Sequence, residues 1–247
     1  MIFLKLGGSL ITDKSKPFTV NWSALETAVK SIGEIDDKLI VGHGGGSFGH
    51  FVAKEYEGFV EGFFKAREAM AKLNNIVVSS LIAKDIYAVG FPPSCFTICK
   101  GGEIEQMNYD ALKMATKYYV PVVHGDVVLD RELGYTILST EKIFKELAKR
   151  MKPRKVLLAS NSAVMFDDEP IKEIADWNYR DVMTKVTGTE NDVTGGMRGK
   201  VIEAAKISAQ TKTEVYIFDG SSPGAIKRAW KYGEGTRVRV TKAPPVD

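Results

Sequence analysis

Cysteine is scarce in this chain of 247 residues, which has only Cys95 and Cys99. We expect both to lie in one strand, where their spacing puts the two side chains on one face but about 13 Å apart, too far for a disulfide. No second group of cysteine and histidine residues completes a zinc site. We therefore expect two small buried side chains, no metal-ligating cluster and a reducing compartment.

Long apolar runs and a strong charge of either sign are also missing. The longest apolar runs have only the length of a strand, which argues against a membrane span. The net charge is +3 and no basic run is present, so the usual features of a nucleic-acid-binding protein are absent. An expected strand that begins at Ile2 leaves no room for a signal peptide. These absences predict a cytoplasmic globular protein that binds neither membrane nor nucleic acid.

Strand-like and helix-like segments alternate along almost the whole chain, which predicts an α/β fold with a mainly parallel sheet between helices. The expected strands are Ile2–Leu6, Leu39–Val41, Cys95–Cys99, Val120–His124, Lys155–Leu158, Val164–Phe166, Val215–Phe218 and Thr236–Val240. One expected helix begins near Trp22, and others cover about Gly62–Lys84 and Met197–Gln210. A further helix is expected to begin with Ser139 or Thr140 as its cap and to run to about Met151. Asp126–Leu129 and Tyr135–Leu138 flank a turn that ends in Gly134, which predicts a hairpin.

Four glycine-rich loops follow expected strands. The most informative is His43–His50, because three consecutive glycines cost backbone entropy and indicate close approach to a ligand. The others are Lys5–Ser9, Asn191–Lys200 and Asp219–Gly224. Ligands collect at the carboxyl ends of parallel strands, where free N–H groups bind anions. One such loop alone is equally compatible with a simple turn, but four of them, two with a lysine, predict a site for more than one phosphate.

The glycine spacings match neither the Walker A loop nor the dinucleotide fingerprint. Four motifs together resemble the amino-acid kinase superfamily over nearly the whole chain: Lys5–Lys14, His43–His50, Val120–Asp126 and Asp192–Lys200. Within that superfamily, Ser47–His50 and Asp13–Lys14 are similar to the isopentenyl phosphate kinases of archaea. The histidine at the end of the glycine loop is the specific part of this resemblance.

The resemblance implies an open αβα sandwich that forms a homodimer. It implies an acceptor-binding lobe at residues 1–150 and a nucleotide-binding lobe at residues 151–247, with a soft boundary near residue 150. The implied activity is transfer of the γ-phosphoryl group of ATP to isopentenyl phosphate, a step of isoprenoid biosynthesis. Mg²⁺ is inferred from this class of reaction.

The resemblance also assigns site residues by matching motifs. Contacts to the acceptor are implied for Gly45, Gly49, His50 and Thr140. Contacts to ATP are implied for Lys5, Gly7, Gly8, Ser9, Gly46, Ser160, Gly195, Gly196, Lys200 and Asp219. Catalytic roles are implied for Lys5, Lys14, His50, Glu141 and Lys200, with Lys5 and Lys14 bridging donor and acceptor.

The chemistry of the reaction suits these residue types. A phosphate monoester is largely ionised at neutral pH, with a second pKa of about 6, so the nucleophile needs no general base. Two mutually repelling anions must instead be neutralised and aligned, which lysines and backbone N–H groups do.

The chain departs from the family pattern at two places. Where the family has Ser-Gly-Asp-Asp, this chain has Ser139–Lys142, so that Thr140 replaces a glycine and Glu141 replaces an aspartate that orients the catalytic lysines. Where the family has Thr-Asp-Val-Asp-Gly near the nucleotide, this chain has Ala159–Ala163, without either carboxylate. An altered donor site, a different small phosphate, phosphonate or carboxylate acceptor, and a non-catalytic phosphate-binding protein therefore stay open as alternatives to a working kinase.

Several of these residues also fit a purely structural role. Lys5, Lys14 and His50 are each also compatible with a place on the surface, and His43 and His124 with bracing of the backbone. The apolar stripe that contains Phe63, Phe64 and Met70 lines either a pocket for a five-carbon tail or the core.

Overall fold

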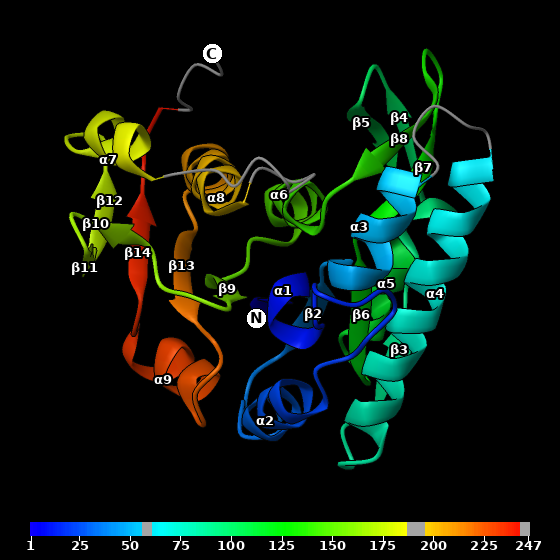
Figure 1. Ribbon diagram of the computed structural model, residues 1–247, viewed down its shortest axis with the longest axis horizontal. Helices are drawn as coiled ribbons and strands as arrows, with labels where there is room; N and C mark the ends of the chain where they lie inside the picture. Colours follow the sequence, from blue (N-terminus) through cyan, green and yellow to red (C-terminus); the bar gives the residue numbers. More distant parts are fainter. Residues whose placement is uncertain (56–60, 187–195, 243–247) are drawn as a thin grey trace.

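The main sheet of eight strands brings the two halves of the chain side by side. The computed structural model describes residues 1–55, 61–186 and 196–242, and Figure 1 shows the sheet running across the molecule between helices. The strand order is β12-β14-β13-β9-β1-β2-β6-β3, and every neighbouring pair is parallel except β13 with β14. The strands are β1 (Ile2–Leu6), β2 (Leu39–His43), β3 (Ala88–Gly90), β6 (Val120–His124), β9 (Lys155–Ser160), β12 (Glu173–Ala175), β13 (Glu214–Asp219) and β14 (Thr236–Arg239).

Helices cover both faces of this sheet. One face carries α1 (Gly8–Ile11), α2 (Trp22–Ile32), α3 (Gly46–Glu55), α4 (Glu61–Ile82) and α9 (Ala225–Tyr232). The other carries α5 (Asp110–Ala115), α6 (Thr140–Met151), α7 (Tyr179–Lys185) and α8 (Gly196–Thr211). Because successive side chains of a strand point to opposite faces, Ile2 and Leu4 of β1 join one apolar core and Phe3 joins the other. The α/β sandwich expected from the sequence is confirmed.

A second sheet of four strands, in the order β5-β4-β7-β8, stands beside the main one. Its strands are β4 (Thr97–Lys100), β5 (Glu103–Met107), β7 (Asp126–Asp130) and β8 (Gly134–Leu138). The antiparallel pair β7 and β8 is the hairpin expected from the sequence. The Asp130 carboxylate accepts backbone N–H groups of Gly101, Gly102, Glu132 and Leu133, at 2.7 to 3.0 Å, and so joins the two turns of this sheet.

The long, strongly periodic helices were predicted well. The expected helix at 62–84 is α4, and α6 begins with Ser139 as its cap, whose Oγ accepts the N–H of Lys142 at 3.2 Å. The sequence did not indicate the short elements α5, α7, α9, β3, β5 and β12, which have too few residues to show a clear period. The segment expected as a strand at 164–166 lies outside the main sheet, since β10 (Met165–Phe166) pairs only with β11 (Glu169–Pro170).

The expectation for the two cysteines is wrong in part. Cys95 closes a short 3₁₀ turn, η1 (Pro93–Cys95), and β4 begins only at Thr97. The reason is the pair Pro92-Pro93, which favours a turn and withholds backbone donors from a sheet. Cys95 is consequently exposed, whereas Cys99 is buried as expected, and both are free thiols.

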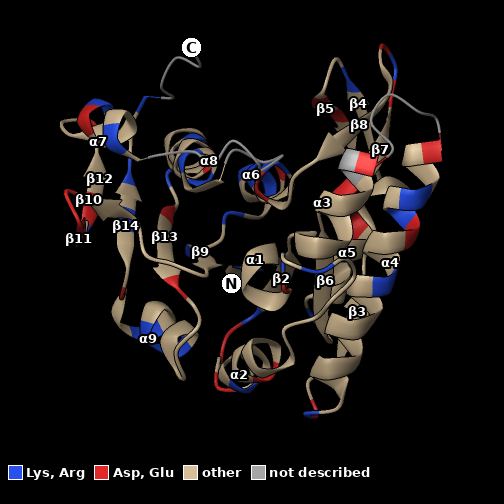
Figure 2. Cartoon of the chain, in the orientation of Figure 1, with Lys and Arg blue, Asp and Glu red and all other residues tan. Residues whose placement is uncertain are grey.

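Charged residues of both signs are mixed over the outer helices and turns, and Figure 2 shows no basic face on the side in view. In the part of the chain that the structure describes, no helix combines the length and the apolar character needed to cross a membrane.

Candidate active site

Two glycine loops lie in direct backbone contact at the carboxyl edge of β1 and β2. A Cβ atom added to Gly8 would lie 2.7 Å from the Cα of Gly46, and one added to Gly44 would lie 2.9 Å from the backbone N of Gly8. Gly46 also has a φ of +50°, a conformation that other residues rarely adopt. The glycines are therefore required where the first turns of α1 and α3 meet, and the free N–H groups of both helices face one small region.

Two hydroxyl side chains fix the geometry of this junction. Thr12 Oγ1 donates to the Gly8 carbonyl at 2.7 Å and accepts the Ser47 N–H at 2.9 Å. Ser47 Oγ in turn donates to the Thr19 carbonyl and accepts the Thr19 N–H, both at 3.1 Å. These bonds fasten the segment that carries Lys14 across both loops. Thr12 and Ser47 stand inside the motifs noted in the sequence, but no role was predicted for either.

Lys5 projects from β1 beneath the glycine loops and is paired with Glu141. The Lys5 ammonium donates to Glu141 Oε1, and the two residues are only 8% and 5% exposed. The Cε atom of Lys5 lies 3.8 Å from the Cβ position of Gly44. Glu141 stands in the first turn of α6, so this helix start supplies the carboxylate that orients the lysine.

The side chain of Thr140, a residue expected at the acceptor, is turned towards β2. The residue is 1% exposed, and its hydroxyl donates to the His43 carbonyl at 2.7 Å. Its methyl group fills the space above Gly42, where a Cβ atom would lie 2.5 Å from it. Both the hydroxyl and the methyl group of Thr140 therefore contact β2. Of this residue, the backbone N–H at the start of α6 stays available to a ligand.

His43 and His124 form a buried, stacked pair behind the glycine loop. Their ring centroids are 5.4 Å apart, and the His43 ring contacts the Gly44 carbonyl at 3.1 Å and the Asn74 side chain at 3.2 Å. Burial, and then the neighbouring His124, lower the pKa of His43 to about 3, and burial also lowers the pKa of His124. Both rings are therefore neutral at physiological pH and brace the start of the loop.

Of the residues expected at the acceptor, Gly49 and His50 belong to α3, which packs on α4, and Gly45 directly precedes this helix. The sulfur of Met70 lies 3.0 Å from the Cβ position of Gly45 and 3.7 Å from that of Gly49, so α4 supports the loop from below. Met70 is buried, which places it in the core and not on an open pocket wall. His50 is half-buried, and its ring packs edge-to-face with that of Phe51, with the ring centroids 6.1 Å apart.

Other residues expected at the donor lie on β9, β13 and α8. Ser160 and Asp219 are register partners at the ends of β9 and β13, and the Cα of Ser160 lies 3.5 Å from the Cβ position of Gly7. Ser160 is 1% exposed, and its Oγ has no hydrogen-bond partner among the described residues. Asp219 is exposed and accepts the Ser221 N–H at 2.9 Å.

Gly196 begins α8 with a φ of +59°, and Lys200 follows one turn later, half-buried. Gly195 and the rest of 187–195 lie outside the described residues.

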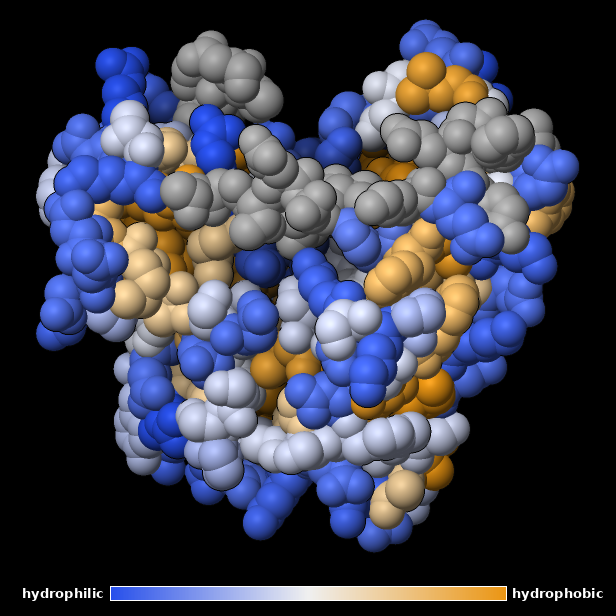
Figure 3. All heavy atoms as spheres, viewed as in Figure 1, coloured by the Kyte–Doolittle hydropathy of each residue, from blue (hydrophilic) through white to orange (hydrophobic). Residues whose placement is uncertain are grey.

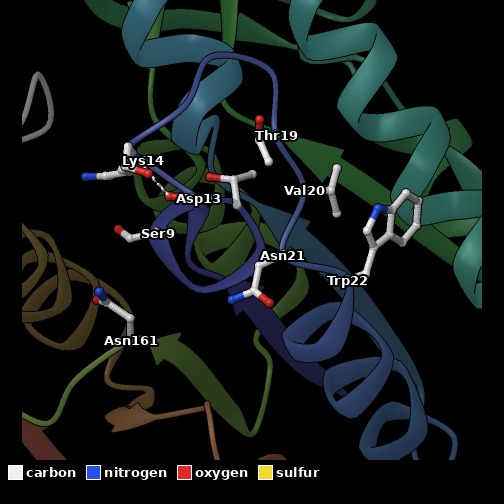
Figure 4. Close-up of a pocket in the computed structure, with 10 residues that line it drawn as sticks. Ser9, Asp13, Lys14, Thr19, Val20, Asn21, Trp22 and Asn161 are labelled. Carbon is white, nitrogen blue, oxygen red and sulfur yellow. Dashed lines mark hydrogen bonds between the residues drawn. The ribbon is translucent and has the colours of Figure 1, made fainter.

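An open cavity of about 600 Å³ lies between the α1 loop and the end of β9. Ser9 and Lys14 line one side, and Asn161 lines the other; Figure 4 shows the Asn161 amide pointing towards Ser9. The wall thus joins residues from both halves of the chain. Within residues 1–55, 61–186 and 196–242, no group of three or more histidine, cysteine, aspartate or glutamate residues could hold a metal ion.

Comparison with known proteins agrees with this geometry. The model of the amino acid kinase family matches residues 1–219. Isopentenyl phosphate kinase of Methanocaldococcus jannaschii is 35% identical, with 93% of this chain and 94% of the relative covered. The enzyme of the same name from Methanothermobacter thermautotrophicus is 34% identical, with 98% of this chain and 99% of the relative covered.

Among solved structures, an isopentenyl phosphate kinase superposes with a TM-score of 0.82 at 29% identity, covering 96% of this chain and 99% of that one. A Giardia lamblia carbamate kinase shares the fold alone, with a TM-score of 0.70 at 12% identity. The chain belongs to the amino acid kinase family, in the group of the isopentenyl phosphate kinases.

Proposed function

We propose that this chain transfers the γ-phosphoryl group of ATP to the phosphate of isopentenyl phosphate and so forms isopentenyl diphosphate. The observation that carries the proposal is the backbone contact between the Gly7-Gly8 and Gly44–Gly46 loops. Two helix starts converge there, beside the buried Lys5, which is the arrangement needed to hold two phosphate groups end to end. Relatives of 35% and 34% identity that bear this enzyme's name support the choice of substrate.

On the acceptor side, the backbone N–H groups near Gly45 and Gly49 and the imidazole of His50 bind the phosphate. On the donor side, the phosphates of ATP lie along Gly7, Gly8, Ser9 and Gly46, with Gly196 and Lys200 at the start of α8. Ser160 and Asp219, at the ends of adjacent strands, face the nucleotide.

The acceptor oxygen attacks as an anion, because a phosphate monoester is already mostly ionised at neutral pH. No proton has to be removed, and the neutral, buried His43 is not a base in this reaction. Lys5 and Lys14 offset the repulsion between donor and acceptor while charge moves onto the leaving diphosphate. Glu141 fixes the direction of Lys5 through their ion pair.

A magnesium ion fits this site only as a companion of the nucleotide. Since the described residues offer no cluster of three ligands, the ion would be held by the ATP phosphates and water, with Asp219 the exposed carboxylate at the donor edge. When bound, it neutralises charge on the donor phosphates. The roles proposed for the residues of this chain do not depend on the magnesium ion.

The proposal extends to the assembly and the compartment: a homodimer in the cytoplasm, with residues 1–150 binding the acceptor and residues 151–247 the nucleotide. The family resemblance supports the dimer, and light scattering on the purified protein measures it directly.

The test of the function is an assay of the purified chain with ATP, Mg²⁺ and isopentenyl phosphate, in which ADP and the diphosphate product are both measured. We expect stoichiometric formation of both, and a loss of about 100-fold or more in Lys5→Ala and in Lys200→Ala. Formation of ADP only with another phosphate, phosphonate or carboxylate would assign a different acceptor. Nucleotide binding without turnover on any acceptor would identify a non-catalytic protein.

A further inference from the structure

One face of α4 follows the acceptor side of the site along its length. Phe63 packs on Tyr135 of the β7–β8 hairpin, with ring centroids 5.6 Å apart. Met70 supports Gly45, and Asn74 contacts the His43 ring at 3.2 Å. Positions 63, 67, 70 and 74 share this face because they are spaced by three and four residues. In Figure 3, hydrophobic residues form a strip on the α3–α4 side of the molecule.

Arg67 is the one charged residue at these four positions. It lies one turn from both Phe63 and Met70, and it is half-buried. Its positive charge is close enough to His124 to contribute to the lowered pKa of that ring. The Nε2 atom of His124 is itself buried without a hydrogen-bond partner among the described residues. Arg67 therefore lies on the face of α4 that packs on β6, between residues that contact the triple-glycine loop and the β7–β8 hairpin.

No carboxylate of the described chain compensates Arg67. Asp126, at the start of β7, is an acidic group on this side, and its charge acts on His124. Its two oxygens are already used by the backbone N–H groups of Ser94, at 3.1 Å, and Val127, at 2.9 Å. A half-buried guanidinium with no counter-charge is costly, and an anionic ligand removes that cost.

The charge balance of the site leaves room for such a cation. The charge of Lys5 is compensated by Glu141, and His43 and His124 are neutral. An acceptor phosphate carries nearly two negative charges at neutral pH and must approach a second anion. Lys14 is shared between donor and acceptor in the proposed function, and the backbone N–H groups and His50 add little net positive charge on the acceptor side.

We propose that Arg67 binds the phosphate of the acceptor from the α4 side, opposite His50. A guanidinium presents donors in a planar fork that matches two oxygens of one phosphate, which fixes orientation as well as charge. The proposal rests on the proposed function, because it takes the acceptor to be a phosphate monoester. It makes Arg67 the side chain by which α4 discriminates a doubly charged phosphate from a singly charged carboxylate.

The test compares Arg67→Ala, Arg67→Lys and Lys72→Ala. Lys72 lies on the exposed side of the same helix, where it pairs with Glu68, and so controls for the loss of one positive charge. We expect Arg67→Ala to raise the KM for isopentenyl phosphate about 10- to 100-fold, with the KM for ATP within about twofold of the wild type. Arg67→Lys should recover part of the loss, and Lys72→Ala should change neither constant.

Binding of inorganic phosphate, followed by calorimetry without ATP, gives a second readout that does not need turnover. Weaker binding in Arg67→Ala than in Lys72→Ala supports the proposal even if isopentenyl phosphate proves not to be the acceptor. Equal phosphate binding in the two variants would overturn it. So would a variant that binds phosphate normally but accepts longer alkyl phosphates, since Arg67 would then face the tail. Circular dichroism melts confirm that each variant is folded.

Discussion

At the scale of single residues, the geometry of the candidate active site depends on side chains that hold other groups in place. Glu141 is the clearest case. It is buried, it stands at the start of α6, and it is the carboxylate paired with Lys5 among the described residues. Replacement of the family's aspartate by a longer glutamate is compatible with this pairing, because α6 and β1 lie close enough for the ammonium and carboxylate to meet.

We predict that Glu141→Gln lowers kcat by roughly 10- to 100-fold, because the amide keeps the shape but leaves a buried ammonium without its counter-charge. The free energy of unfolding should fall by about 3 kcal/mol for the same reason. Glu146→Gln is the matched control, since Glu146 pairs with Lys149 on the same helix away from Lys5. Steady-state kinetics and urea denaturation measure the two effects, and wild-type kcat in Glu141→Gln would contradict the role.

The single residues also show where sequence reasoning stops. The close approach of Gly8 and Gly46 was predictable, because a run of glycines after a strand costs backbone entropy and is seldom found without such an approach. The hydrogen bonds of Thr12 and Ser47 were not predictable, because they join positions far apart in the chain. Thr140 was expected at the acceptor on resemblance alone, and its methyl group proved to be needed over Gly42.

At the scale of elements, predictability followed length and burial. β1, β2, β9, α4 and α6 were found because each buries a regular pattern of apolar residues against the sheet. β3 and β5 were missed, since both are short and mostly exposed or half-buried. Pro92 and Pro93 place a 3₁₀ turn before β4. The strand pattern of the sequence does not show that this turn includes Cys95.

The second sheet depends on Asp130, whose carboxylate ties both turns together. Hydrogen bonds from four backbone N–H groups outweigh the effect of burial and lower the pKa of Asp130 to about 2. A lowered carboxyl pKa stabilises the fold above the pKa of the unfolded chain, about 3.9, and this contribution disappears as the pH falls through 2. We therefore expect Asp130→Asn to lower the melting temperature at pH 7, and the difference from wild type to shrink between pH 4 and pH 2. Asp110→Asn, at an exposed helix start, is the control for the loss of one carboxylate in the same thermal melts.

At the scale of the whole molecule, one sheet serves both substrates, because β1 lies between β2 and β9. Register pairing places Leu6 beside His43 on one side and beside Ala159 on the other. The loop after β2, proposed for the acceptor, and the residues at the end of β9, proposed for the donor, are thus separated by the single strand β1. A shift of β1 by one residue relative to its two neighbours would turn Lys5 to the opposite face of the sheet.

The buried pair of His43 and His124 behind the glycine loop makes the stability of the whole fold sensitive to acid. The folded-state pKa of His43, about 3, lies below its unfolded value of 6.5, so below pH 6.5 the unfolded chain binds a proton that the folded chain excludes. Stability is then lost as the pH falls from 6.5 towards 3, by about 2 kcal/mol at pH 5 relative to pH 7.5 from this one group. His124, whose pKa is also lowered, adds to the slope.

Urea denaturation at several pH values between 5 and 7.5 measures this slope, in a range where most carboxylates stay ionised. His124→Gln should be less stable at pH 7.5 because the stacked ring is lost, yet should show a shallower decline towards pH 5. A wild-type protein whose free energy of unfolding is the same at pH 5 and pH 7.5 would show that burial does not lower the pKa of these two histidines.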